Sequence, residues 1–110
     1  SSAASDVYKR QAFVHKPAAV ISSSRRAGSV TSMDVLNKHL SISEMPIVTS
    51  NYWNEVHGHT PSDVEQDREG LDTMYALGKN MAWMLKCIEA GKKAEIEVPQ
   101  NKKRTTNFIR

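Results

Sequence analysis

The sequence predicts an α/β fold in which two parallel strands alternate with two helices as a βαβα unit. Two short apolar runs, residues 18–22 and 46–50, suit strands that are buried on both faces. Each run leads into a polar loop, and each loop leads into a segment with helical periodicity. At 110 residues, the chain has room for one modest domain.

The first eleven residues stand outside this pattern. Residues 1–11 read SSAASDVYKRQ, with small polar residues and no periodicity. They are similar to a translated adapter or vector sequence. We therefore expect a disordered leader that is foreign to the domain, which then spans residues 12–91.

The first strand is expected at residues 18–22, followed by a small, polar loop at residues 22–29. Thr31 or Ser32 can cap the helix that comes next. The apolar residues of this helix recur at i, i+3 and i+7, which predicts about three turns. They are Met33, Leu36 and Leu40.

The second strand is expected to begin near Met45. Pro46 cannot donate to a central ladder, which favours a strand start or an edge strand. The crossover between the two parallel strands should be right-handed. The following loop, residues 51–59, carries two aromatics and two histidines. Ligands bind beyond the carboxyl ends of strands in α/β sheets, so this loop is either a site or a surface loop with incidental aromatics.

The last helix has the strongest signals. Thr60 suits the N-cap, Pro61 the first helical position and Asp63 a capping-box position. Acidic residues gather in its first half and basic residues in its second, the order that the helix dipole favours. We expect Gly70 to bend or interrupt the helix and Gly91 to end it. Its apolar stripe comprises Val64, Leu71, Met74, Gly78, Met81, Leu85 and Ile88, and Leu77 and Met84 widen it.

Composition excludes several classes of protein. The net charge is +3, and much of it lies in a basic tail, residues 92–110, that we interpret as a solvated end rather than a nucleic-acid contact. Cys87 is the only cysteine, which excludes an intrachain disulfide and favours a reducing, cytoplasmic compartment. No apolar run approaches membrane-spanning length.

Four runs together resemble flavodoxin-like NAD(P)H-dependent FMN reductases. They are MPIVTSNYWNEVHGHTP (residues 45–61), SRRAG (24–28), GLDTM (70–74) and LGKNMAW (77–83). The resemblance covers residues 13–90 and extends to the closing TNFIR (106–110). It implies the C-terminal βαβα portion of a three-layer, flavodoxin-like parallel sheet, with the phosphate-binding loop and the first three strands missing.

The resemblance also implies a cofactor site in the loop after the first strand. Small residues let the backbone approach a planar flavin, and two arginines could stabilise negative charge on it or pair with a nucleotide phosphate. The alternative is that both arginines are solvated loop residues. The implied FMN-binding residues are Ser23, Ser24, Arg25, Arg26, Ala27 and Gly28.

Tyr52, Trp53 and His57 are the candidate substrate-binding residues. The aromatics could stack on a nicotinamide or a quinone, or could plug the gap between loop and helix. His57 could give a proton to a reduced quinone, or could order the loop through a hydrogen bond. We predict neither a metal site at His57 and His59 nor a nucleophilic role for Cys87, and no side chain is assigned as a catalytic acid, base or nucleophile.

The sequence thus indicates an FMN-dependent oxidoreductase that takes electrons from NADPH or NADH and passes them to a small-molecule acceptor. The intact protein is expected to be a homo-oligomer, with Trp83 and Cys87 as packing or subunit contacts. The fragment itself is expected to be inactive. The alternative is a non-catalytic α/β interaction module, because the long helix carries more apolar surface than two strands can cover.

Overall fold

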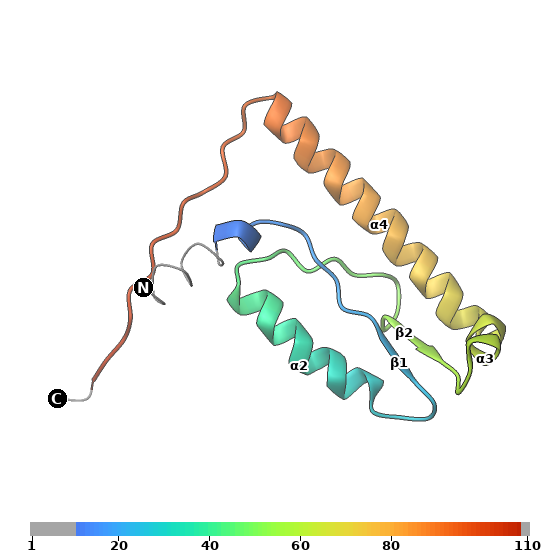
Figure 1. Cartoon of the computed structure of the whole chain (residues 1–110). Coiled ribbons are helices and arrows are strands. Elements are labelled where there is room, and N and C mark those ends of the chain that lie inside the picture. Colours follow the sequence, from blue (N-terminus) through green and yellow to red (C-terminus); the bar gives the residue numbers. More distant parts are fainter. Residues whose placement is uncertain (1–10, 109–110) are drawn as a thin grey trace.

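The computed structural model describes residues 11–108 and shows a mixed α/β chain with a two-stranded parallel sheet (Figure 1). Most of the expected leader lies outside the described residues, as do the last two residues of the closing run. None of the described helices is both long enough and apolar enough to cross a membrane. The elements are β1 (Ser22–Ser24), α2 (Ser29–Ile42), β2 (Glu55–His57), α3 (Pro61–Gln66) and α4 (Arg68–Lys93).

The predicted strands lie side by side, but the regular sheet begins further along the chain. Ala18 and Ile47 form an isolated parallel bridge between the two apolar runs. The ladder then resumes with Ser22 opposite Glu55, inside the two segments that we predicted as loops. The predicted strand positions, 18–22 and 46–50, are therefore wrong, because the regular strands begin at Ser22 and Glu55.

An excursion of the second run explains this shift. Four residues lead from Ala18 to Ser22, whereas eight lead from Ile47 to Glu55. The four extra residues leave the ladder, and the Asn54 side chain closes the excursion by donating to the Val20 carbonyl at 3.1 Å. The sheet is interrupted between its apolar and polar halves for this reason.

Helix α2 begins earlier than predicted, and of the three predicted face residues Met33 and Leu40 are at least half-buried while Leu36 is exposed. Gly28 is its N-cap with φ of 94°, so neither Thr31 nor Ser32 caps it. Met33 is buried as expected, whereas Leu36 is 47% exposed.

The break between α3 and α4 lies three residues before the position predicted for it. The capping box at Thr60 and Asp63 is confirmed. The helix breaks at Asp67 rather than at Gly70, because the Asp67 carboxylate starts a new helix by accepting the Gly70 N–H at 2.9 Å. Helix α4 also continues past Gly91 to Lys93.

The two long helices cover opposite faces of the sheet. The Glu55 side chain bonds to Ser29 of α2, while the side chain of Val56 lies against Gly70 of α4. Successive side chains of a strand point to opposite faces, so the order of layers is α2, sheet, α4.

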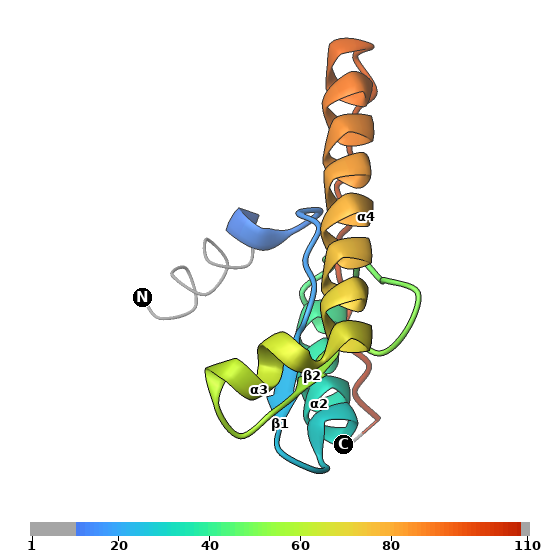
Figure 2. The same ribbon diagram turned by 90° about the vertical axis from the view of Figure 1, so that its right-hand side faces the viewer.

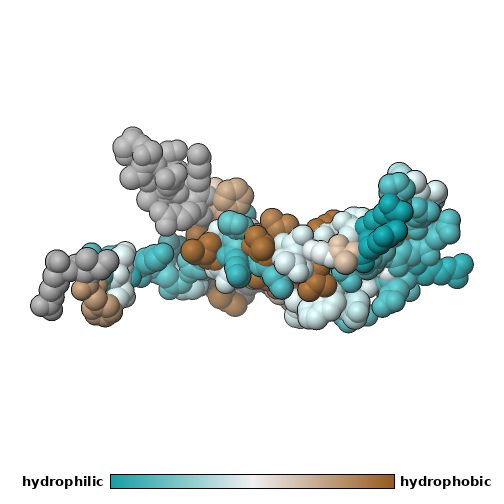
Figure 3. All heavy atoms as spheres, turned by 90° about the horizontal axis from the view of Figure 1, so that it is seen from below, coloured by the Kyte–Doolittle hydropathy of each residue, from teal (hydrophilic) through white to brown (hydrophobic). Residues whose placement is uncertain are grey.

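The chain is far more open than a compact domain. Its accessible surface is 9215 Å², whereas a compact folded chain of this mass exposes about 6100 Å². The buried apolar residues among those described are only Met33, Val48 and Leu77. Helix α4 and the extended tail both reach well beyond the sheet (Figures 1 and 2), and apolar residues come to the surface on the face seen from below (Figure 3).

Candidate functional site

The loop at residues 25–28 lies at the carboxyl end of β1 and leads directly into α2. All four of its residues are exposed, as is Ser23, while Ser24 is half-buried. The structure therefore brings the six predicted cofactor-binding residues together in one continuous segment. Neither Arg25 nor Arg26 forms an ion pair with another residue of the described part of the chain, so both positive charges are free to meet an anionic ligand.

The start of α2 leaves backbone donors available beside this loop. Gly28 adopts a left-handed conformation, and no side chain caps the helix by a hydrogen bond. A Cβ atom added to Gly28 would meet nothing within 4 Å, so the space in front of the loop is open. Uncapped N–H groups at a helix start can donate to carbonyl or anionic oxygens of a ligand.

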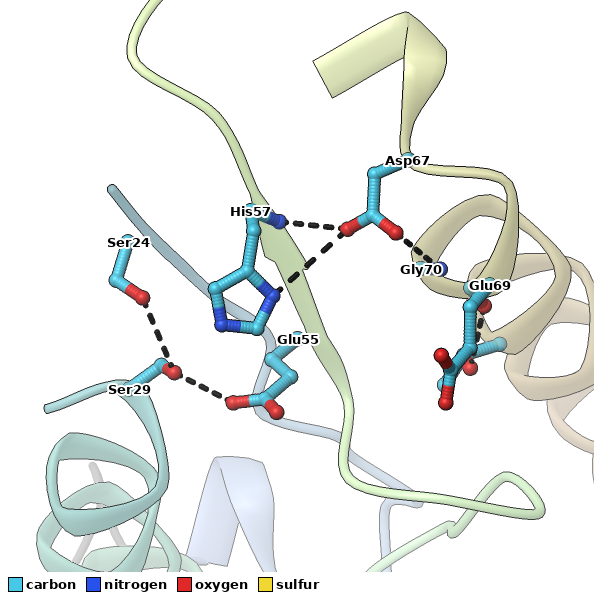
Figure 4. Close-up of polar contacts among 8 residues, drawn as sticks. Ser24, Ser29, Glu55, His57, Asp67, Glu69 and Gly70 are labelled. Atoms are coloured by element: carbon cyan, nitrogen blue, oxygen red, sulfur yellow. Dashed lines mark hydrogen bonds and ion pairs between the residues drawn. The ribbon is translucent and has the colours of Figure 1, made fainter. Parts of the chain in front are cut away.

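A buried hydroxyl fixes the loop to the second strand. Ser29 is only 4% exposed and donates to the Glu55 carboxylate at 2.5 Å, while Ser24 donates to the Ser29 hydroxyl at 3.3 Å (Figure 4). Neither Ser29 nor Glu55 was a candidate from the sequence. The pairing of Ser22 with Glu55 would have pointed to them. The predicted strand positions did not include this pairing.

His57 lies at the end of β2 and is held by Asp67. The His57 N–H donates to the Asp67 carboxylate at 2.7 Å, and its ring Nδ1 lies 3.8 Å from the same oxygen (Figure 4). Hydrogen bonds from the Gly70 and His57 N–H groups lower the pKa of the Asp67 carboxyl against the opposing effect of burial. The carboxylate thus stays charged, and it joins β2 to the start of α4.

The two candidate aromatics lie at the other end of β2. Tyr52 and Trp53 precede the strand, with their rings 6.2 Å apart and tilted by 45°. The prediction that they follow the last strand is therefore wrong, because the excursion places them before β2. Both are more than half exposed, and the length of the paired strands separates them from residues 25–28.

Two cavities beside β2 share Tyr52, which also lines a third cavity against α4. One of about 120 Å³ also contains Glu55, His57 and Asp67, so the structure brings Tyr52 and His57 together. The other, of about 460 Å³, lies beside α2 and includes Trp53, Met33 and Asn37. Trp53 thus faces a different space from His57.

Within residues 11–108, no three His, Cys, Asp or Glu side chains are grouped closely enough to hold a metal ion. Cys87 is an exposed free thiol on α4.

Searches of family models, curated proteins and solved structures find no match to this chain.

Proposed function

We propose that this chain is the C-terminal portion of an FMN-dependent NAD(P)H oxidoreductase with a flavodoxin-like sheet. The observation that carries the proposal is the loop at residues 25–28. It combines two arginines that form no ion pair within residues 11–108, an open left-handed glycine and an uncapped helix start at the carboxyl end of a parallel strand.

The residues present fit a flavin ring. Gly28 and Ala27 let the backbone approach a planar group, and the first N–H groups of α2 could donate to its carbonyl oxygens. Arg25 and Arg26 offer charge to a reduced ring or to a nucleotide phosphate. FMN would supply the hydride and electron chemistry, while the chain binds and orients it.

The exposed edge of β1 supports the view that further strands belong to the sheet. Ser22 and Ser24 direct their backbone groups towards β2 through the bonds to Asn54 and Gly58. Alternate residues of a parallel strand point the other way, so Ile21 and Ser23 face an edge with which no described strand pairs. Ile21 is also 60% exposed although it belongs to the apolar run.

The same openness accounts for the expected inactivity of the fragment. A strand beside β1 would bring its own carboxyl-end loop next to residues 25–28, and by the resemblance the phosphate-binding loop lies in that missing part. The chain alone therefore offers arginines and backbone donors on one side of the ring only. We expect FMN to bind it weakly or not at all.

On the acceptor side, Tyr52 and His57 line the same small cavity next to Asp67. This places an aromatic ring and an imidazole at one position, where a planar acceptor could stack and be hydrogen-bonded. Trp53 contributes to the larger cavity beside α2 instead. We assign Tyr52 and His57, rather than Trp53, to the small-molecule electron acceptor.

The test is the flavin content of the protein expressed with its native upstream sequence. The expected result is a yellow protein whose flavin absorbance bleaches on addition of NADPH. Arg25→Ala with Arg26→Ala should weaken FMN or NADPH binding at least about tenfold, whereas Lys102→Ala with Lys103→Ala in the tail should not. A colourless protein that takes up no added FMN would refute the proposal.

The second candidate function is a non-catalytic interaction module. It is favoured by an apolar groove of about 570 Å³ on α4, which includes Leu71, Met74 and Gly78. The native upstream sequence discriminates the two, since a strand with a hydroxyl-rich loop favours the reductase and an unrelated domain favours the module.

A further inference from the structure

Helix α4 carries a second surface that the sheet does not use. Its members recur at alternating intervals of three and four residues, the spacing that keeps side chains on one face of a helix. All are exposed except Ala76, which is half-buried. They are Glu69, Asp72, Ala76, Lys79, Trp83 and Lys86, and we call them the outer face of α4.

The outer face has an unusual exposed aromatic. Trp83 is 64% exposed, although tryptophan is among the residues that gain most from burial. Helix α4 lies in front of the other labelled helices and strands in Figure 2. The Trp83 indole on the second half of the helix is therefore largely exposed.

A hollow lies beside the first half of the same helix. A cavity of about 480 Å³ is lined by Glu69, Asp72 and Thr73 of α4 and by Asn51 and Tyr52 of the excursion. Tyr52, which is 55% exposed, supplies an aromatic wall, and Asp72 supplies an acceptor for an indole N–H.

Charge also divides the outer face into two halves. Glu69 and Asp72 are acidic, whereas Lys79 and Lys86 are basic. None of these four side chains forms an ion pair with another residue in the described part of the chain. Their charges are therefore unmatched among the described residues of one copy.

We propose that a second copy of this chain binds the outer face of α4, with the two helices antiparallel about a two-fold axis between Ala76 and Lys79. In this arrangement the Trp83 indole of each copy enters the hollow beside Asp72 and Tyr52 of the other. Glu69 lies opposite Lys86 of the second copy, and Ala76 lies opposite its Lys79. Every contact occurs twice, as a two-fold interface requires.

The alternatives fit less well. A parallel pairing would place acid against acid and lysine against lysine, and would leave each Trp83 beside its own image rather than beside a hollow. The apolar groove that includes Gly78 shares only Lys79 with the outer face, and nothing in the structure shows what covers it. The proposal does not depend on FMN, because none of residues 23–28 takes part.

The test is sedimentation equilibrium of the 110-residue chain and its variants, with far-UV circular dichroism to establish that each variant is folded. The unmodified chain should dimerise in the micromolar range. Trp83→Ala should weaken the dimer at least about thirtyfold, as expected for a central tryptophan. Leu85→Ala, an apolar residue outside the outer face that is 49% exposed, is the matched control and should change the dissociation constant less than about threefold.

A charge swap tests the antiparallel pairing itself. Glu69→Lys and Lys86→Glu should each weaken the dimer about tenfold or more, because each creates two like-charge contacts. The double variant should recover to within about threefold of the unmodified chain. The two residues are about 25 Å apart along one helix, so the recovery cannot arise within a single copy. A chain that stays monomeric at high micromolar concentration, a dimer insensitive to Trp83→Ala, or a double variant without recovery would each overturn the proposal.

Discussion

Asp67 is the residue on which the junction of sheet and helix depends, and replacing it gives the sharpest test of the fold. Its carboxylate accepts the N–H groups of Gly70 and His57, one at each oxygen, at 2.9 and 2.7 Å. Loss of a helix N-cap costs about 1 kcal/mol, and loss of a bond from a partly buried N–H to a charged group costs about 1.5–3 kcal/mol. Asp67→Ala should therefore lower the free energy of unfolding by about 2–4 kcal/mol.

Urea denaturation followed by circular dichroism at pH 7 measures this loss. Asp67→Asn keeps one side-chain oxygen and should cost about half as much, since an amide can accept from only one of the two N–H groups through that oxygen. The comparison variant is Asp63→Ala, which removes the exposed carboxylate that completes the capping box of α3 and should cost about 1 kcal/mol. Asp67→Ala costing no more than Asp63→Ala would refute the reasoning.

The same carboxylate predicts how stability depends on pH. Its pKa in the folded chain lies below the ordinary value of 3.8, chiefly because of the Gly70 N–H and then the His57 N–H. The unfolded chain therefore binds the proton more readily, so the contribution of Asp67 is complete above about pH 5 and declines as the pH falls through 3.8 and below. Asp67→Asn should remove this part of the acid dependence. An unchanged acid profile in Asp67→Asn would show that other groups cause it.

Three further substitutions test other contacts, each by urea denaturation at pH 7. Gly70→Ala should destabilise the chain by about 1–3 kcal/mol, as overpacking of a filled site does. Its Cβ would collide with the Asp67 carboxylate and approach the Val56 side chain to 2.9 Å. Gly78→Ala in the same helix meets nothing within 4 Å and should stabilise the chain by about 1 kcal/mol; a loss at Gly78 would contradict the open space described there. Ser29→Ala should cost about 1–3 kcal/mol by leaving the Glu55 carboxylate without its donor, and a change below about 0.5 kcal/mol would show that water replaces the hydroxyl.

Sequence reasoning succeeded where the signal is local. The capping box at Thr60 and Asp63 depends on four consecutive residues, and the structure contains it as predicted. The helical segments likewise follow from periodicity, although the last of them is divided into α3 and α4. Both depend on contacts between residues close in sequence, which a single sequence displays.

The errors arose where a distant partner decides the outcome. Polar residues such as Ser22 and Ser23 form a strand because β2 lies beside them, which no local propensity reveals. Asp67 rather than Gly70 sets the helix break because the carboxylate also serves the His57 N–H ten residues earlier. The site residues Ser29 and Glu55 were missed for the same reason, since their bond spans 26 residues.

Completing the sheet and pairing two copies through α4 would use different surfaces of the chain, so the two proposals are compatible. β1 has β2 on one edge and an open edge on the other, where the rest of a flavodoxin-like sheet would join. The hollow beside Tyr52 and Asp72 lies instead between α4 and the excursion that precedes β2. Completing the sheet would therefore leave the outer face of α4 free to pair.

Tyr52 connects the two surfaces, because it lines both the hollow proposed for Trp83 of the second copy and the small cavity that contains His57. A dimer of the complete protein would thus fix the ring of Tyr52 from one side while the acceptor meets it from the other. Trp83→Ala in the complete protein should then raise the KM for a quinone acceptor while leaving FMN content and the KM for NADPH unchanged. An equal rise in both KM values would indicate that the loss of the dimer disturbs the whole domain, and would separate Tyr52 from the acceptor site.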